Sequence, residues 1–564
     1  MTNYSANIKT MKKLTLNLSL ILTLLIMMSC SQIKEEVDLI VFNTKVYTVD
    51  SAFNTAESFV VKDGKFYDVG TNEEMLAKYS APNNFNAIGQ TVFPGFIDGH
   101  CHFYGYGLGL QQNADLRGTK STEEIIERLK EFREDHPYAW LTGRSWDQND
   151  WEIKEFPGKE VLDAAFPDIP VYLTRVDGHA AWVNSKAIEL AKITAKTKID
   201  GGDIILKNGE PTGVLIDNAM GLVRSIIPAP SEEMSRNALI EAQENCFQVG
   251  LTSVVDCGVN YKIVNLMDEL HKDGELKMRI NAMLDPSQEN FDGFVKNGPY
   301  VTDHLTVRSV KVYADGALGS RGALMIEPYS DDPKNKGLLI EPHDYYREIS
   351  KLAYDNDYQM CIHAIGDAAN RVSLEIFGEF LKEKNDRRWR IEHSQIIHPD
   401  DFQLFEKYSI IPSIQQTHAT SDMYWAEDRV GAERIKGAYA YKELLKTNGW
   451  IIAGTDFPVE KIDPLLTFYA SVARKDKDGW PTNGFNMENA LDREETLRSI
   501  TIWAAKGSFE ENVKGSIEIG KHADFVILDR DIMTANEKDI LNTNIVATYV
   551  GGESVYNTKK QYDK

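Results

Sequence analysis

Short apolar segments that end in metal-ligand side chains recur along this chain. The first, Val92–His102, contains a Pro-Gly break and ends in His100 and His102. In a β-strand, residues i and i+2 point to the same face, so the two imidazoles would project side by side from the strand end. Two imidazoles on one face form half of a divalent-metal site. Later strands must therefore supply the remaining ligands if this pair binds a metal.

Three later apolar segments also end in a histidine or a carboxylate. They are Tyr358–His363, Trp389–His393 and Trp450–Asp456. About one strand-plus-helix unit separates the first two segments, and about two units separate the second and the third. This spacing is typical of a (β/α)8 barrel, whose active sites lie at the carboxyl ends of the strands. The alternative, hydrogen-bonded polar residues at the barrel ends, explains a single histidine more easily than an ordered series.

The predicted fold class is α/β, with a TIM-like barrel over residues 93–507. Between the first two strands, an inserted subdomain of about 103–248 must have its own structure, because βα loops are usually far shorter. Residues 37–92 and 508–564 contain short alternating strands, with a hairpin signal at Asp63-Gly64, and predict a small β-sandwich formed by both chain ends. We expect the eight barrel strands to end near His102, Asp256, Leu284, Asp315, His363, His393, Gln416 and Asp456.

Several motifs resemble the amidohydrolase superfamily, and most of all amidohydrolase family 3, the branch of N-substituted formamide deformylase. The similarity runs from about Val37 to Tyr556 and is specific for the fold and the metal site, but not for the substrate. The motifs that carry it are Pro94–His102, Gly143–Gln148, Arg175–Ala180, Lys311–Arg321, His363–Asp367, Arg390–Gln395, Gly454–Glu460 and Gly520–Phe525.

The resemblance implies a hydrolase that holds one or two divalent metal ions. Imidazole and carboxylate ligands suit Zn²⁺, and also Fe²⁺, Mn²⁺ or Co²⁺. It also implies that Lys311 is carbamylated by CO₂ and bridges two metals. The alternative is an unmodified lysine that binds a substrate carboxylate. The expected ligands are His100, His102, Lys311, His363, His393 and Asp456.

Further residues are candidates for catalysis and substrate binding. By resemblance, Asp456 is the general acid–base group, and His418 would stabilise the developing oxyanion. In the insertion, Asp177 would orient His179 as a further catalytic residue. Arg175 suits an anionic substrate group, and Trp146 is a candidate pocket residue. The alternative for Arg175, Asp177 and His179 is a loop that is held only by the hydrogen bonds of its Asp-Gly pair. The alternative for Trp146 is a position in the core.

The N-terminus has the pattern of a bacterial lipoprotein signal. Lys12 and Lys13 precede an apolar run, and Ser29-Cys30 follows it, so we expect residues 1–29 to be a signal peptide. Cys30 would be acylated, with residues 30–36 as a tether to a bacterial membrane, on the outer-membrane or periplasmic side or at the cell surface. A membrane-spanning anchor is the alternative, but the run is short and contains polar residues.

Composition narrows the function further. The 564 residues are 42% hydrophobic and 26% charged, an ordinary globular balance, and the net charge is −23. Nucleic acid is not an expected partner, because binding phosphates needs a basic surface. The resemblance then predicts a hydrolase that cleaves a C–N bond of a small amide-like molecule. The alternatives are a substrate-binding lipoprotein on an inactive scaffold and a metal-dependent isomerase or lyase; the oligomeric state stays open, a homodimer included.

Overall fold

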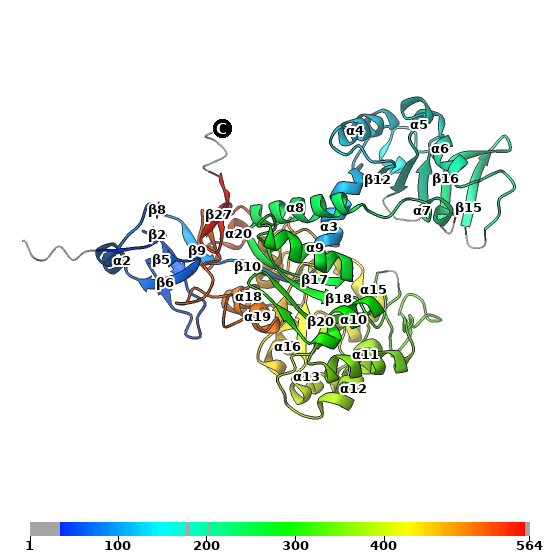
Figure 1. Cartoon of the computed structure of the whole chain (residues 1–564). Helices are drawn as coiled ribbons and strands as arrows, with labels where there is room; N and C mark the ends of the chain where they lie inside the picture. The colour runs from blue at the N-terminus through cyan, green and yellow to red at the C-terminus, as the bar shows by residue number, and fades with distance from the viewer. Residues whose placement is uncertain (1–33, 176–179, 200–201, 218, 320, 559–564) are drawn as a thin grey trace, which may run out of the picture. The chain divides into compact units, whose positions relative to one another are not determined.

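The computed structural model describes residues 34–558, apart from 176–179, 200–201, 218 and 320 (Figure 1). The chain forms two compact units. One contains the described residues up to Gly95 together with Glu510–Ala535 and the chain from Thr543 onward. The other contains Phe96–Phe509 and Asn536–Asn542. Among the described residues, no helix is both long and apolar enough to cross a membrane.

The first unit is built mainly from a four-stranded and a six-stranded sheet, and both chain ends contribute strands to the six-stranded one; β1 (Glu35–Glu36) and β7 (Tyr79–Ser80) form a further short pair. The strand β9 (Thr91–Pro94) pairs antiparallel with β25 (Phe525–Leu528), so the two ends are joined by main-chain hydrogen bonds. Their alternating apolar side chains, among them Phe59 and Phe525, fill a shared core. The other strands are β2 (Leu39–Phe42), β3 (Lys45–Tyr47), β4 (Thr55–Ala56), β5 (Ser58–Lys62), β6 (Lys65–Gly70), β8 (Asn83–Asn86), β26 (Ile545–Val550) and β27 (Glu553–Asn557).

The second unit contains the predicted barrel, which is confirmed. Eight parallel strands follow one another in chain order, and helices cover their outer side (Figure 1). Most of the strand residues are buried, as expected for a sheet that is covered on both faces. The strands are β10 (Phe96–Cys101), β17 (Leu251–Val259), β18 (Arg279–Leu284), β20 (Leu305–Tyr313), β21 (Gln359–Ala364), β22 (Arg390–His393), β23 (Ile411–Ile414) and β24 (Ile452–Ala453).

Barrel helices follow the strands and begin with recognisable caps. In α9 (Tyr261–Lys272), the Asn260 side chain accepts a hydrogen bond from the Ile263 amide. In α17 (Pro464–Ala473), Asp463 caps the helix and proline occupies its first turn. The other barrel helices are α10 (Gln288–Gly293), α11 (His343–Asp355), α12 (Asp367–Leu381), α13 (Phe402–Tyr408), α14 (Gln416–Asp422), α15 (Ala426–Arg434), α16 (Tyr441–Asn448), α18 (Arg493–Ser499) and α19 (Ile502–Gly507).

The barrel is nearly closed by hydrogen bonds between its first and last strand ends. The Asp456 amide donates to the His100 carbonyl oxygen, and the His102 amide donates to Phe457, both at 2.8 Å. Gly454 permits this approach, because a Cβ atom there would lie 2.4 Å from the His100 nitrogen. The closure brings the first predicted ligand motif and the last one together.

The segment after β10 forms an inserted lobe with its own six-stranded sheet. Apolar side chains form one cluster around Trp146 and Trp182 and another around Tyr172 and Leu215. Its elements are β11 (Asn113–Asp115), α4 (Thr122–Asp135), β12 (Leu141–Trp146), α5 (Glu160–Ala165), β13 (Val171–Arg175), β14 (Ala180–Val183), α6 (Ser185–Leu190), β15 (Gly202–Lys207), β16 (Glu210–Asp217) and α7 (Met220–Arg224).

Two helices lead into and out of this lobe. They are α3 (Phe103–Gln112), which begins directly after His102, and α8 (Glu232–Gln248). The helices approach closely at Gly107, where a Cβ atom would lie 2.0 Å from the Ala238 carbonyl oxygen. The Tyr104 and Ser235 hydroxyl groups are 2.9 Å apart across this contact.

Candidate metal centre

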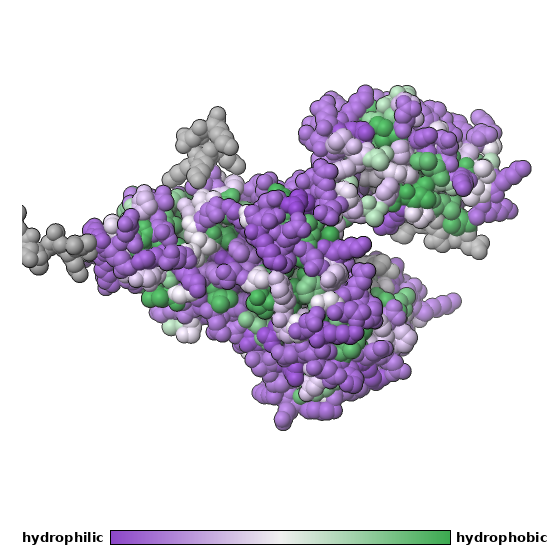
Figure 2. Space-filling view, in the orientation of Figure 1, coloured by the Kyte–Doolittle hydropathy of each residue, from purple (hydrophilic) through white to green (hydrophobic). Residues whose placement is uncertain are grey.

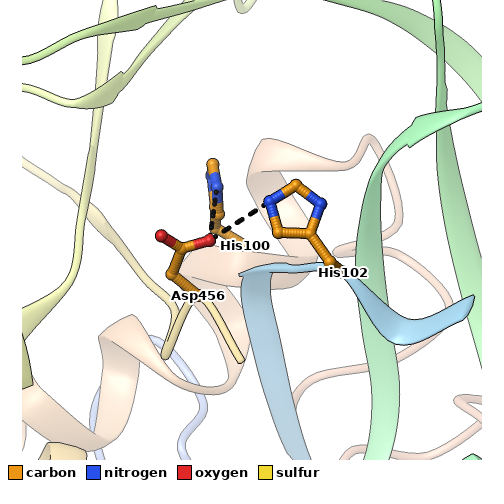
Figure 3. Close-up of side chains that lie close together, drawn as sticks. All are labelled: His100, His102 and Asp456. Carbon is orange, nitrogen blue, oxygen red and sulfur yellow. Dashed lines mark ion pairs between the residues drawn. The ribbon is translucent and has the colours of Figure 1, made fainter. Parts of the chain in front are cut away.

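The ends of the first and last barrel strands bring two histidines and a carboxylate together (Figure 3). The Nε2 atoms of His100 and His102 each lie 3.3 Å from Asp456 Oδ1. These distances allow all three side chains to bind one cation, and the ligand atoms lie within 4.8 Å of one another. His393, His418 and Asp456 form a second such group.

The neighbouring strands add the other predicted side chains to the same place. The rings of His363 and His393, at the ends of β21 and β22, have centroids 4.4 Å apart, and the His393 ring is 4.9 Å from that of His100. Lys311, on β20, is fully buried and its amine lies 4.3 Å from the centre of the Tyr313 ring. Asp315 Oδ1 lies 3.6 Å from His363 Nε2.

Two of these residues have strained backbones. His393 and Asp456 have φ angles of 74° and 62°, in the left-handed region that residues with a Cβ atom rarely adopt. Such conformations cost on the order of 1–3 kcal/mol each and persist where the surrounding structure enforces them, often at functional sites. The strand β24 ends at Ala453, three residues before Asp456 and earlier than the sequence predicts.

Unsatisfied polar atoms show that a cation fits here. Leaving a polar atom buried without a partner costs roughly 1–3 kcal/mol. The described structure contains five such atoms in this cluster, each without a hydrogen bond of normal geometry. The histidine nitrogens and the carboxylate oxygen among them, together with the partly exposed His102, are the donor set that divalent transition metals prefer. The atoms are His100 Nε2, His363 Nε2, His393 Nδ1, Lys311 Nζ and Asp456 Oδ1.

A buried charge relay orients His100. Its Nδ1 atom lies 2.5 Å from Glu392 Oε2, and Glu392 Oε1 is 2.5 Å from Arg390 Nε. Burial would raise the pKa of Glu392, but the charges of Arg390 and His100 outweigh it and hold that pKa below its usual value. The arrangement leaves the Nε2 lone pair of His100 directed at the cluster, as in carboxylate–histidine–metal triads.

His102 is oriented in the same manner by a main-chain group. Its Nδ1 atom lies 3.0 Å from the Cys257 carbonyl oxygen at the end of β17. The Nδ1–H group donates this hydrogen bond, so Nε2 carries the lone pair that faces Asp456. Neither Glu392 nor the Cys257 carbonyl was identified from the sequence, although Glu392 lies within the Arg-Ile-Glu-His motif.

The contacts of Glu392 with Arg390 and with His100 allow the effect of a conservative substitution at Glu392 to be predicted. Glu392→Gln should weaken metal binding about 10–100-fold, because groups that orient a ligand histidine typically contribute this much. The measurement is a competition titration with a chromogenic chelator. Glu375→Gln, which changes an exposed carboxylate on α12, is the control. Unchanged affinity in the Glu392 variant would show that the relay does not support the metal.

His418 lies on the other side of Asp456. Its Nε2 atom is 3.4 Å from Asp456 Oδ2, and its Nδ1 atom is 3.3 Å from Glu460 Oε1. Burial would lower the pKa of His418, but the two carboxylates outweigh it and raise that pKa to about 10. Ser421 donates a 2.6 Å hydrogen bond to Glu460. Sequence reasoning assigned no role to Glu460, although it is the last residue of the Gly454–Glu460 motif, four residues beyond Asp456.

Two candidate residues of the inserted lobe, Arg175 and Trp146, lie within the described structure. Arg175 ends β13, where it pairs with Asp147 at 2.6 Å and donates to Gln148. Trp146 is fully buried in the lobe core, with its indole N–H donating to the Leu173 carbonyl, so the structure favours the core alternative. Asp177, His179 and the predicted lipidation residue Cys30 lie outside the described residues.

A parallel eight-stranded barrel with histidine and carboxylate ligands at the carboxyl ends of its strands defines a metal-dependent hydrolase. The chain belongs to the amidohydrolase family, whose sequence model matches residues 85–556.

Individual relatives cover most of the chain. It is 32% identical over 544 residues to the protein LONG AFTER FAR-RED 3 of Arabidopsis thaliana, covering 92% of this chain and 91% of that one. It is 25% identical over 543 residues to the N-substituted formamide deformylase of Arthrobacter pascens, covering 91% and 97%. Among solved structures, an uncharacterized metal-dependent hydrolase from Pyrococcus furiosus is similar, with a TM-score of 0.75, 30% identity, and coverage of 88% and 100%.

Proposed function

We propose that this protein hydrolyses a C–N bond, other than a peptide bond, in a small amide-like molecule. The observation that carries the proposal is the convergence of unsatisfied ligand atoms beside Asp456 and His418. The similarity to an N-substituted formamide deformylase supports this bond type. Zn²⁺ is the metal that this donor set favours, with Fe²⁺, Mn²⁺ and Co²⁺ as substitutes.

The residues of the chain supply the acid–base steps. A divalent cation, when bound, activates water and polarises a carbonyl group. The Asp456 carboxylate accepts a proton from the attacking water as the new C–O bond forms, and then delivers that proton to the nitrogen as the C–N bond breaks. The products are a carboxylic acid and an amine.

His418 stabilises the negative charge that develops at the carbonyl oxygen of the substrate. With its pKa raised to about 10, it is protonated at neutral pH. A buried cation stabilises an oxyanion more strongly than an exposed one, because water does not screen it. Glu460 and Ser421 hold the imidazolium in place.

The function is tested on purified protein loaded with metal. A panel of N-formyl and N-acyl derivatives of aliphatic and aromatic amines is incubated with it, and amine release is measured. We expect turnover of at least one compound class, and loss of that turnover after chelation. The proposal is overturned if neither the Zn²⁺-loaded nor the Mn²⁺-loaded protein releases an amine from any compound. It is also overturned if a compound is converted without consumption of water.

We propose that Lys311 is carbamylated and completes a site for two metals. In this step, the neutral amine forms an N–C bond with CO₂ and releases a proton. Within the described residues, the buried amine makes no hydrogen bond. A carbamate would add two oxygen ligands where an ammonium group would repel the metals.

Metal loading should therefore depend on CO₂. Reconstitution of metal-free protein is expected to improve with bicarbonate, and Lys311→Ala should lose most of its metal, with partial rescue by short carboxylic acids. Intact-mass and metal analysis of the two proteins measure this. Lys442→Ala, which changes a partly exposed lysine, is the control. Full occupancy beside an unmodified Lys311 amine would contradict the proposal.

We also propose that Cys30 is acylated and anchors the exported protein to a bacterial membrane. Cys30→Ser should abolish lipid labelling and move the protein from the membrane fraction to the soluble fraction. Metabolic labelling with a fatty-acid analogue, followed by fractionation, measures both effects. Persistent labelling of the variant would exclude this residue as the anchor.

A further inference from the structure

The inserted lobe contains a cavity that the proposed hydrolysis does not use. Its volume is about 750 Å³, within the range of small-molecule sites. One wall is the sheet face carrying Thr142, Arg144 and Tyr172, and the other is formed by α7 and the segment that leads into α8. In the parallel pair β12–β13, Thr142 is aligned with Tyr172 and Arg144 with Thr174, so these side chains lie on one surface.

The charge of this cavity is opposite to that of the chain. Arg144, Arg175 and Arg224 line it, and none of its described lining residues is acidic, although the protein has a net charge of −23. Asp147 neutralises Arg175 through the 2.6 Å pair. No ion pair or hydrogen bond engages the guanidinium groups of Arg144 and Arg224 within the described residues. Both side chains are exposed, so the cavity offers a ligand two cations that are solvated by water and have no partner among the described residues.

A buried hydroxyl group there also lacks a hydrogen bond of normal geometry. Tyr172 is 5% exposed, and within the described residues no group meets its Oη atom at hydrogen-bond geometry. Burial raises the pKa of Tyr172, and the Arg224 charge and the neighbouring Thr174 hydroxyl group oppose that rise. A buried tyrosine hydroxyl normally has a partner. A ligand that accepts a hydrogen bond from this hydroxyl group would remove the free-energy cost of burying it without a partner.

The rest of the wall is apolar. Trp140, Met220, Ile227 and Met234 contribute to it, and Figure 2 shows hydrophobic side chains gathered on the lobe over α7. A fully hydrated inorganic ion would leave this surface without a partner. An organic anion with an apolar body would cover it.

We propose that this cavity binds an organic carboxylate with an aromatic or branched apolar body. Arg144 and Arg224 bind the carboxylate, since the planar guanidinium group matches its two oxygens. The Tyr172 hydroxyl donates a hydrogen bond to it, and the apolar wall contacts the body. The proposal does not depend on a metal or on the bond that the enzyme cleaves.

The test is calorimetric titration of the full-length, metal-free protein with 3-phenylpropionate. The neutral 3-phenylpropanol and inorganic phosphate are titrated in parallel. We expect saturable binding of the carboxylate, with the alcohol and phosphate each about tenfold weaker, because the first lacks the charge and the second the apolar body.

Variants locate the site. Arg144→Gln and Arg224→Gln should each weaken binding of 3-phenylpropionate about tenfold, as expected for a hydrogen bond to a charged group. Tyr172→Phe should weaken it several-fold. Arg128→Gln, on α4 of the same lobe, pairs with Glu124 at the surface and should change nothing. Equal thermal unfolding of the variants shows that the lobe remains folded.

The His102→Ala variant separates this site from the metal centre, because the His102 side chain is 30% exposed and its removal leaves the core intact. It should bind 3-phenylpropionate as the wild type does, even if the protein hydrolyses no amide. The proposal is overturned if the wild type shows no saturable binding in the millimolar range, if phosphate binds equally well, or if the two arginine variants bind normally.

Discussion

Asp456→Asn is expected to retain most of the bound metal and to lose about 10²–10⁴-fold in kcat/KM, the usual contribution of a general acid–base group. The amide has nearly the same shape as the carboxylate but cannot accept a proton from water at neutral pH. In the wild type, Asp456 lies 3.3 Å from His100 and His102 and 3.4 Å from His418, so its proton-accepting oxygens are surrounded by the groups of the site.

Activity and metal content must be measured on the same preparation. Asp478→Asn changes an exposed carboxylate beyond α17 and serves as the matched control, which should behave as the wild type. Near-normal turnover of Asp456→Asn at full metal occupancy would remove Asp456 from the mechanism. Loss of the metal together with the activity would instead assign it a ligand role.

The largest effect on metal content is expected for His100→Ala/His102→Ala. The pair supplies two imidazoles from one strand end, and the ligands that remain would come from other strands. Without the pair, metal per chain should fall close to background, and amide hydrolysis should fall with it. Metal analysis after dialysis against a weak chelator measures this.

His100 is fully buried, so its loss also leaves a cavity, and the variant could unfold. His102→Ala alone is the milder change, because that side chain is 30% exposed. It should lower metal affinity while thermal unfolding stays near that of the wild type. His343→Ala, at the exposed start of α11, is the control. Unchanged metal content in the double variant would exclude the predicted site.

The sequence predicted the barrel, and it predicted the order of the candidate ligands along the barrel, because both follow from periodicity. Each ligand comes at the end of an apolar run, and parallel strands bring their carboxyl ends to one rim. His100 and His102 lie together because residues i and i+2 of a strand point to the same face. Lys311 is buried within β20, as its position between Val310 and Val312 predicts for a residue that faces the barrel interior.

The orienting groups could not be predicted in the same manner. Glu392 and His393 are adjacent, and simple alternation would place them on opposite faces. Both contact His100 because the backbone takes a left-handed φ angle at His393, which no pattern of residue types reveals. Glu460 reaches His418 through the turn after Asp456, so its role depends on loop geometry.

The lobe was less predictable still. Its length indicated an independent structure, but the strand partners β12 and β13 come from separate motifs, and their register decides which side chains share a surface. Trp146 belongs to a motif that resembles the family, yet its side chain packs against Trp151 and Trp182 in the core. The cavity lined by Arg144 and Arg224 depends on the same pairing.

Metal stoichiometry of the purified wild-type protein, set against its amide-hydrolysing activity, tests the central claim most directly. The structure predicts at least one divalent transition metal per chain, an activity that falls in proportion as a chelator removes the metal, and recovery when the metal is restored. A protein that contains no transition metal, or that hydrolyses amides equally well with and without it, would contradict the account.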